Sequence, residues 1–325
     1  MTPPARGVNL PAHIALRADD SGAFHRHFDE MLEGYAYGGV TRLRLGFDWS
    51  RLQPRPGDLD GQWVEWYFDV ITAATRHDID VWASLLERSI PHWFDDERGF
   101  SDPKSAGRYW PRFVEACADT FGDRVAGWCP IDDPIGFAAR TEPLDVVRHG
   151  ELVDTMVVAW RDAWRILAGG PPVAGSFGVR LVKPIDTSVE AAEAARREDH
   201  LRWKTFLRGV RDGTVVIPGR ADRVLADLAG AIDIVGIKLR TDLGDDTSVT
   251  DESLRRWHER ASTIVHRAVD EGPDKPLAIT FHASRRGMIE TDSDRNHFTD
   301  AFERAANAAT VDGLDITTVF TTEVS

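Results

Sequence analysis

Hydrophobic and polar positions alternate along the chain with two different spacings, and these spacings predict its secondary structure. Short apolar runs of strand length are separated by longer segments in which apolar residues recur every three or four positions, as in an amphipathic helix. We predict strands over residues 7–14, 41–47, 80–86, 125–131, 172–178, 232–239, 276–281 and 315–320. We predict helices over residues 23–36, 64–77, 104–121, 147–168, 189–212, 250–271 and 293–309.

The order of these elements predicts an α/β fold. Strands that alternate with helices, and that are apolar enough to be covered on both faces, are typical of a parallel sheet with right-handed crossovers. Eight such strands predict closure into a (β/α)8 TIM barrel. Because no repeat, low-complexity tract or linker divides the sequence, we predict a single domain over residues 1–325.

The last predicted strand lies close to Ser325, so the final helix of the barrel is expected to be missing. A barrel without that helix exposes an apolar stripe between its neighbours. We expect either the proline-rich opening segment or a homodimer interface to cover the stripe.

Composition narrows the choice of partners. The chain has 42% hydrophobic residues and a formal net charge of −14 at pH 7. This charge repels phosphate backbones and anionic lipids, so we expect no nucleic-acid or membrane partner. Cys117 and Cys129 lack CxxC spacing and lie in apolar runs, which favours reduced, packed thiols over a disulfide or a zinc site. With no signal-like or membrane-spanning apolar run, the expected location is cytoplasmic.

Candidate chemistry lies at the carboxyl ends of the predicted strands, where TIM barrels carry their functional residues. If the barrel forms, these ends surround one opening, and clustered ionisable groups in a cleft indicate a binding or catalytic site. The candidate residues are Asp48, Trp49, Glu87, Arg88, Asp132, Asp133, Lys238, Arg240, His282 and Glu323.

Several motifs around these positions resemble those of glycoside hydrolase family 1. RLGFDWSRLQP (44–54) is similar to the RFSISWSRIQP-type signature, and FVEACADTFGDRVAGWCPIDDP (113–134) is similar to FAEYAEVVFERFGDRVKYWITLNEP. Looser similarity covers LLERSIPHWF (85–94), VGIKLRTD (235–242) and PLAIT (276–280). The resemblance implies a TIM barrel that cleaves β-glycosides with retention, using one Glu in Asn-Glu-Pro as acid/base and one in Thr-Glu-Asn-Gly as nucleophile.

The framework of the family survives in this sequence, but its catalytic carboxylates do not. Arg44, with the Trp49 motif that follows it, matches the second-strand signature, and in the family this arginine contacts the nucleophile. The resemblance places Asp133 at the acid/base position, and Phe281 at the nucleophile position. A phenyl ring cannot form a glycosyl-enzyme ester, so the family's double displacement is excluded with these residues in those roles.

The remaining sugar-contact positions are also changed. The resemblance places Asp132 where the family has the Asn of Asn-Glu-Pro. An amide that can donate a hydrogen bond is thereby replaced by a negatively charged carboxylate. Glu87 and Arg88 stand at the His-Trp pair, and Lys238 replaces the Asn of Asn-Tyr-Tyr. These exchanges indicate a ligand other than a plain neutral glucoside.

Three functional hypotheses follow. In the first, which we favour, the chain is a divergent carbohydrate-active enzyme. Its substrate would be a polar glycoside or sugar derivative, which could carry a negative charge. Asp133 would be the general acid, and Glu87 or Glu323 the base or nucleophile. A carboxyl separation of roughly 5 to 5.5 Å would imply retention, and roughly 6.5 to 9.5 Å inversion.

In the second hypothesis the chain is a catalytically inactive relative that binds a small polar ligand or a protein partner. Arg88, Lys238 and Arg240 would then select an anionic group. In the third, a divalent metal is held by Glu87, Asp133, His282 and Glu323. Nearby cations and the absence of tight ligand spacing oppose the third hypothesis, so we expect no metal and no cofactor.

Overall fold

The computed structural model describes residues 2–17, 24–143, 145–240, 250–282 and 292–322. These residues form two compact units. The N-terminal unit is Ala5–Gly175, and the C-terminal unit contains the described residues of 176–322 together with 2–4. The single domain over residues 1–325 stays a prediction.

Four parallel strands form the sheet of the N-terminal unit, in the order β4-β3-β2-β1. They are β1 (Ala5–Leu10), β2 (Arg42–Gly46), β3 (Asp80–Leu86) and β4 (Gly127–Ile131). All four coincide with predicted strands. The first ends earlier than expected because Pro11 is the N-cap of a short helix.

Helices follow each of these strands. The long ones are α2 (Phe24–Tyr37), α4 (Gly61–Arg76), α6 (Pro103–Phe121) and α8 (Val146–Leu167). Short helical segments were not predicted: α1 (Ala12–Ala15), α3 (Trp49–Leu52), α5 (His92–Asp96), η1 (Gly99–Ser101) and α7 (Pro134–Thr141). The long helices begin at good caps, since Asp60, Asp102 and Asp145 each accept hydrogen bonds from backbone N–H groups of the first turn.

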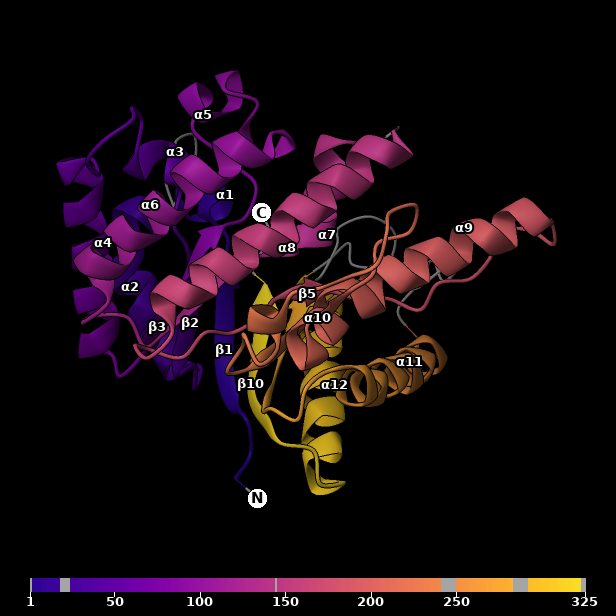
Figure 1. The fold of residues 1–325 in the computed structure, drawn as a ribbon. Helices are drawn as coiled ribbons and strands as arrows, with labels where there is room; N and C mark the ends of the chain where they lie inside the picture. The colour runs from indigo at the N-terminus through magenta and orange to yellow at the C-terminus, as the bar shows by residue number, and fades with distance from the viewer. Residues whose placement is uncertain (1, 18–23, 144, 241–249, 283–291, 323–325) are drawn as a thin grey trace. The chain divides into compact units, whose positions relative to one another are not determined.

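The long helices cover one face of this sheet (Figure 1), and aromatic side chains pack between the sheet and the helices. Phe47, just after β2, stacks on Tyr67 of α4 at 4.2 Å and meets Phe121 of α6 edge-on at 4.9 Å. Trp49 stacks on Phe113 of α6 at 4.7 Å. Such ring pairs stabilise the fold by more than the burial of their apolar area alone. The core of the N-terminal unit therefore lies between the sheet and its helices.

The sheet of the C-terminal unit has four parallel strands in the order β10-β9-β8-β5. They are β5 (Phe177–Gly178), β8 (Val235–Arg240), β9 (Leu277–His282) and β10 (Ile316–Thr322). A small antiparallel pair, β6 (Thr214–Val215) with β7 (Arg223–Val224), lies outside this sheet. The predicted strand 172–178 is the most reduced, because only its last two residues pair with β8.

Helices of the C-terminal unit also match the predicted segments, except the short η3, which was not predicted. They are α9 (Val189–His200), η2 (Leu201–Thr205), α10 (Phe206–Asp212), η3 (Ala226–Leu228), α11 (Asp251–Glu271) and α12 (Asp292–Val311). The predicted helix 189–212 is continuous but contains a π-helical turn at η2. Arg267 of α11 holds this region by two hydrogen bonds to Asp199, at 2.6 and 2.7 Å, and by stacking over Trp203 at 4.4 Å.

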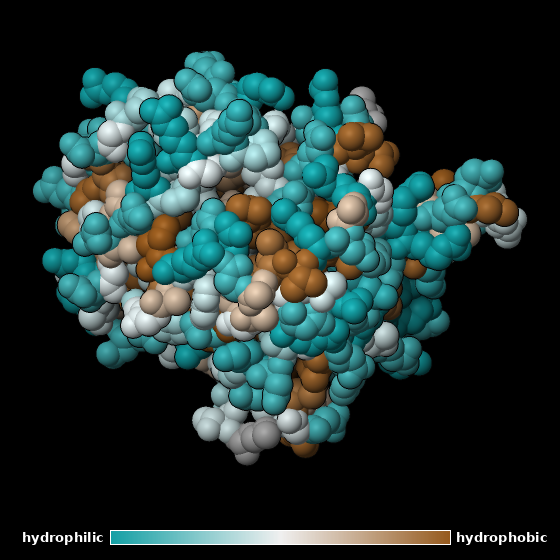
Figure 2. Space-filling view, viewed as in Figure 1, coloured by the Kyte–Doolittle hydropathy of each residue, from teal (hydrophilic) through white to brown (hydrophobic). Residues whose placement is uncertain are grey.

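Hydrophilic residues predominate on the face shown in Figure 2, in keeping with the net charge of −14. Among the described residues, no helix combines the length and the apolar character that a membrane crossing requires.

Candidate functional site

The two faces of the N-terminal sheet differ in polarity. Strand register places Asn9 beside Arg44, and Arg44 beside Trp82. Ser84 lies two residues after Trp82 in β3 and pairs with Cys129 of β4. Because side chains alternate between faces, Ser84 and Cys129 lie on the same face as Arg44 and Trp82. The opposite face carries apolar residues under the helices: Leu10, Leu45, Ala83 and Trp128. Polar side chains are therefore buried on the face that the helices do not cover.

Arg44 is the centre of this polar face. Its Nε donates a 2.6 Å hydrogen bond to Oδ1 of Asn9, and its Nη2 lies 3.8 Å from Oδ1 of Asp132. Arg44 is only 4% exposed and Asp132 only 8%. Removing charged groups from water costs several kcal/mol per ion unless partners compensate. Arg44 and Asp132 therefore compensate each other's charge in a buried position at the end of β4.

Glu87 lies at the end of β3, and its carboxylate is held by the chain itself. Its Oε2 accepts a 2.8 Å hydrogen bond from the backbone N–H of Ala12. Gly46 passes so close that a Cβ there would lie 2.5 Å from the same oxygen and 2.3 Å from the Ala12 nitrogen. Arg140 of α7 donates to the backbone oxygen of Glu87 at 3.2 Å. Glycine at position 46 therefore makes room for the carboxylate.

Asp133 begins α7 in an unusual conformation. It has φ 47° and ψ 68°, the left-handed region, and its Oδ1 accepts a 2.9 Å hydrogen bond from the N–H of Gly136. Aspartate and asparagine tolerate this region better than most residues, because their short side chains bond locally. Asp133 therefore caps α7, whether or not it also has a catalytic role.

Replacing Asp133 with alanine should lower the free energy of unfolding by about 1 to 2 kcal/mol, through loss of the cap and strain in the left-handed region. Asp133→Asn should lose much less, because the amide oxygen also caps. Urea denaturation of both variants measures the difference. Equal losses in the two variants would show that capping is not what stabilises α7.

Asp48 and Trp49 follow β2 and start α3. Asp48 caps this helix by accepting from the N–H of Ser50 at 3.0 Å, and its own N–H donates to Tyr67 Oη at 2.8 Å. Trp49 is 0% exposed, with its Nε1 donating to Gln53 Oε1 at 2.8 Å. In this conformation Trp49 packs in the aromatic core and offers no surface to a ligand. Arg88, by contrast, is exposed.

Burial keeps Cys129 and Tyr67 protonated. It raises the pKa of the Cys129 thiol to about 12; Asp132 and Glu87 act in the same direction, against Arg44. Burial also raises the pKa of Tyr67 well above its usual value. Cys129 and Tyr67 are therefore a neutral thiol and a neutral phenol at physiological pH. Sequence patterns suggested reduced, packed cysteines, and both are free and buried.

A small cavity of about 10 Å³ opens beside the Glu87 carboxylate. Its lining residues are Ala12, His13, Phe47, Asp48, Glu87, Arg88 and Ser89. This volume compares with the space that a single water molecule needs.

In the C-terminal unit, Lys238 and His282 lie on one face of the sheet. Lys238 pairs with Thr280 in register, and Arg240 with His282. Both Lys238 and His282 are half-buried. The side chain of Arg240 and the whole of Glu323 lie outside the described residues.

Phe281 lies on the other face of β9. Its ring stacks on Phe302 of α12 at 5.0 Å and meets Trp257 of α11 edge-on at 5.4 Å. It is 1% exposed. The residue at the position that the resemblance assigns to the nucleophile is thus a core residue that faces the helices. Its neighbours Thr280 and His282 occupy the opposite face.

The structure brings Arg44, Asp132 and Glu87 together within the N-terminal unit. Sequence reasoning missed Asn9, Gly46 and Arg140, which support them. Asn9 could have been found as the polar residue at an alternate position of an apolar strand. Gly46 and Arg140 gave no comparable signal, because their contacts cross between separate strands and helices. Among the described residues, no group of three or more His, Cys, Asp or Glu side chains is placed to hold a metal ion.

Comparison with known proteins gives the fold and the family. A family model described as "Glycosyl hydrolase family 1" matches residues 18–216. Beta-glucosidase 34 of Oryza sativa subsp. japonica is 24% identical over 273 residues, which cover 71% of this chain and 53% of that protein. Beta-glucosidase 5 of the same organism is 29% identical over 113 residues, which cover 34% of this chain and 22% of that protein. The chain thus spans about half, or less, of the length of these curated relatives.

Solved structures resemble the chain over nearly its whole length. A family 1 β-glucosidase from Thermotoga maritima superposes with a TM-score of 0.76 at 15% identity, covering 98% of this chain and 87% of the other. This likeness confirms the predicted fold class, the (β/α)8 TIM barrel. The matched model spans well over half of the sequence and includes the strand ends that carry Arg44, Glu87 and Asp133. The chain belongs to glycosyl hydrolase family 1.

Proposed function

We propose that this chain is a ligand-binding member of the family that does not cleave glycosides by double displacement. The placement of Phe281 carries the proposal. A retaining mechanism needs a carboxylate that attacks the sugar. Phe281 offers only a phenyl ring, buried between Trp257 and Phe302.

Ligand binding is supported by the charged groups kept at the strand ends of the N-terminal unit. An apolar core of the same volume is often as stable as a buried ion pair or more so. Arg44, Glu87 and Asp132 therefore suggest a role beyond stability. Perturbed or buried charges gathered at one edge of a sheet are a common mark of binding sites.

The carboxylates favour a neutral, hydroxyl-rich ligand such as a sugar, which departs from the sequence-based expectation of a ligand other than a plain neutral glucoside. Asp48, Glu87 and Asp132 offer carboxylate oxygens, which accept hydrogen bonds from hydroxyl groups. An anionic ligand would depend on Arg88, Lys238 and Arg240, as the sequence-based hypothesis had it.

A second candidate function is hydrolysis with relocated carboxylates. The observation that favours it is the burial of Glu87 and Asp133, at 7% and 5% exposure, because catalytic carboxylates commonly act where water is excluded. Asp133 would then protonate the leaving group, and Glu87 or Glu323 would act as base or nucleophile.

Binding and turnover of the same compound separate the two candidates. We expect 4-nitrophenyl β-D-glucoside to bind without releasing nitrophenol, and Glu87→Gln to weaken this binding about tenfold or more by removing a charged acceptor. Calorimetry measures the binding and absorbance the release. Glu115→Gln, at an exposed position of α6, is the matched control and should bind as the parent does.

Two results would contradict the proposal. Steady nitrophenol release that Asp133→Asn or Glu87→Gln abolishes would favour hydrolysis. Parent-like binding by Glu87→Gln would remove Glu87 from the site. The homodimer, the cytoplasmic location and the absence of a nucleic-acid partner stay predictions.

A further inference from the structure

A pocket of about 500 Å³ lies in the N-terminal unit where the segments after β3 meet α7. Its volume falls in the usual range of small-molecule sites. Its lining residues are Ser50, Arg88, Ile90, His92, Asp95, Arg98, Gly99, Phe100, Ser101, Phe137 and Thr141. None of them has a role in the proposal above except Arg88.

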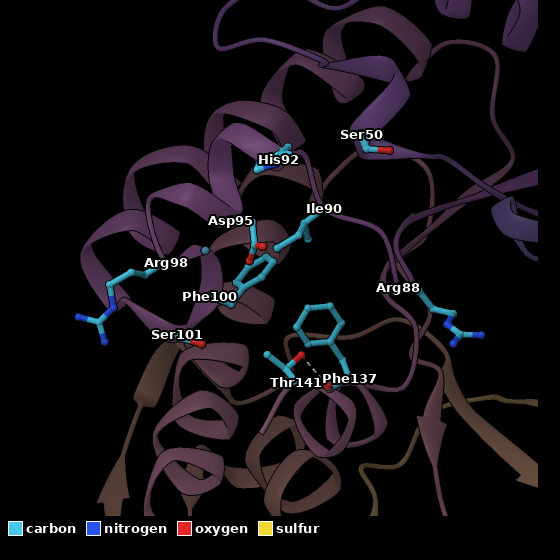
Figure 3. A pocket seen from close by; sticks show the side chains of 11 residues that line it. Ser50, Arg88, Ile90, His92, Asp95, Arg98, Phe100, Ser101, Phe137 and Thr141 are labelled. Carbon is cyan, nitrogen blue, oxygen red and sulfur yellow. Dashed lines mark hydrogen bonds between the residues drawn. The ribbon is translucent and has the colours of Figure 1, made fainter. Parts of the chain in front are cut away.

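The interior of this pocket is apolar with one acidic group. Figure 3 shows the rings of Phe100 and Phe137 near its centre, with Ile90 beside them and the Asp95 carboxylate next to the Phe100 ring. The two rings meet edge-on at 5.7 Å. The guanidinium groups of Arg88 and Arg98 point away from these rings (Figure 3). Asp95 is thus the acidic group beside the rings, and His92, which also lines the pocket, interacts with it electrostatically.

The Asp95 carboxylate is available as an acceptor. Within the described part of the chain this carboxylate makes no side-chain hydrogen bond, and Asp95 is exposed. The adjacent Asp96 differs, because its Oδ1 lies 3.2 Å from Nδ1 of His92. The two neighbouring acids thus provide a natural comparison, one facing the pocket and one paired outside it.

The wall that carries Phe100 is built with backbone strain. Arg98 and Gly99 both have positive φ, at 67° and 49°. A Cβ at Gly99 would lie 3.2 Å from Cδ1 of Ile90, so a side chain there would require Ile90 to shift by a few tenths of an ångström. Left-handed non-glycine residues such as Arg98 cost of order 1 to 3 kcal/mol and concentrate at functional sites.

The pocket adjoins the strand-end cluster. Arg88 lines both this pocket and the small cavity beside Glu87. Helix α7, which supplies Phe137, is tied to β3 by the hydrogen bond from Arg140 to the backbone oxygen of Glu87. The two places are neighbours but are built from different side chains.

We propose that this pocket is a second binding site, for a neutral saccharide. A sugar ring has a rim of hydroxyl groups and an apolar C–H face, which suits the half-buried Ile90; Phe100 and Phe137 are 2% and 5% exposed and support this wall from behind. Asp95 accepts from such hydroxyls, and the side-chain hydroxyls of Ser50, Ser101 and Thr141 can donate or accept. Asp95 opposes an anionic ligand. The inference does not rest on the role proposed for Glu87.

Amide NMR titration of the full chain with cellobiose and with methyl β-D-glucoside tests the proposal at residue resolution. We expect saturable shifts of the Gly99 and Ser101 signals. Asp95→Asn should weaken binding about tenfold, as expected for one hydrogen bond to a charged acceptor. Asp96→Asn should bind as the parent does. Glu87→Gln should leave these shifts unchanged, which separates this site from the strand-end cluster.

Three outcomes would overturn the proposal. One is the absence of saturable shifts at Gly99 and Ser101 with both sugars. Another is equal affinity in Asp95→Asn and Asp96→Asn. The third is displacement of the sugar by benzyltrimethylammonium at lower concentration, since an organic cation would then be the better match for Asp95 and the rings.

Discussion

Replacing Arg44 with methionine should lower the free energy of unfolding by about 3 to 5 kcal/mol, the cost of leaving a buried charge without its partner. Arg44 is 4% exposed, bonds Asn9 at 2.6 Å and lies 3.8 Å from Asp132. Methionine fills similar space but provides no charge and no donor. Urea denaturation followed by tryptophan fluorescence measures the loss.

Arg42→Met is the matched control, because Arg42 lies on the same face two residues earlier in β2 and is half-buried over Trp82, at 5.9 Å from its ring. It should cost about 1 kcal/mol. Adding Asp132→Asn to Arg44→Met should recover part of the stability, since the amide is neutral. A loss below 1 kcal/mol in Arg44→Met, or no recovery in the double variant, would contradict the importance of this ion pair.

Restoring a carboxylate with Phe281→Glu should lower the free energy of unfolding by about 4 kcal/mol or more and yield no glycosidase activity. The ring is 1% exposed between Trp257 and Phe302, so glutamate would lose the packing and bury a charge among aromatic side chains. Denaturation in urea and hydrolysis of 4-nitrophenyl β-D-glucoside are the two measurements.

Phe281→Leu keeps an apolar side chain and should cost about 1.5 kcal/mol or less if the site repacks. His282→Glu places a carboxylate one residue later, on the opposite face of β9, and should cost less than Phe281→Glu. Parent-like stability of Phe281→Glu together with released nitrophenol would refute the orientation described for this side chain and reopen the double displacement.

Much of the fold could be predicted from the sequence, because strand and helix periods differ and the long helices have strong caps. The eight strands and seven long helical segments follow from this pattern, and β3 matches its predicted range, 80–86. Short helices such as α1 and α7 were missed because one or two turns carry too few apolar positions to show a period. The predicted strand 172–178 shrank to β5, since its apolar run says nothing of pairing partners.

The candidate site could be predicted only in part. Asp132 and Glu87 could be predicted as site residues because the apolar pattern of the sequence shows where their strands end. The burial of Trp49 could not be, because its partners Phe94, Trp110 and Phe113 come from segments far along the chain. The direction of Phe281 also escaped the motif comparison. A sequence motif does not show which face of a strand a side chain occupies. To establish the face, the strand register and the neighbouring side chains must be known.

The contact between Gly46 and Glu87 links two positions that are distant in sequence. Any side chain at position 46 would collide with the Glu87 oxygen and the Ala12 nitrogen. Family members with a larger residue there must carry a shorter or differently directed side chain at the position of Glu87, so the two positions are expected to vary together. The smallest residue of β2 thereby dictates which acid the neighbouring strand can present.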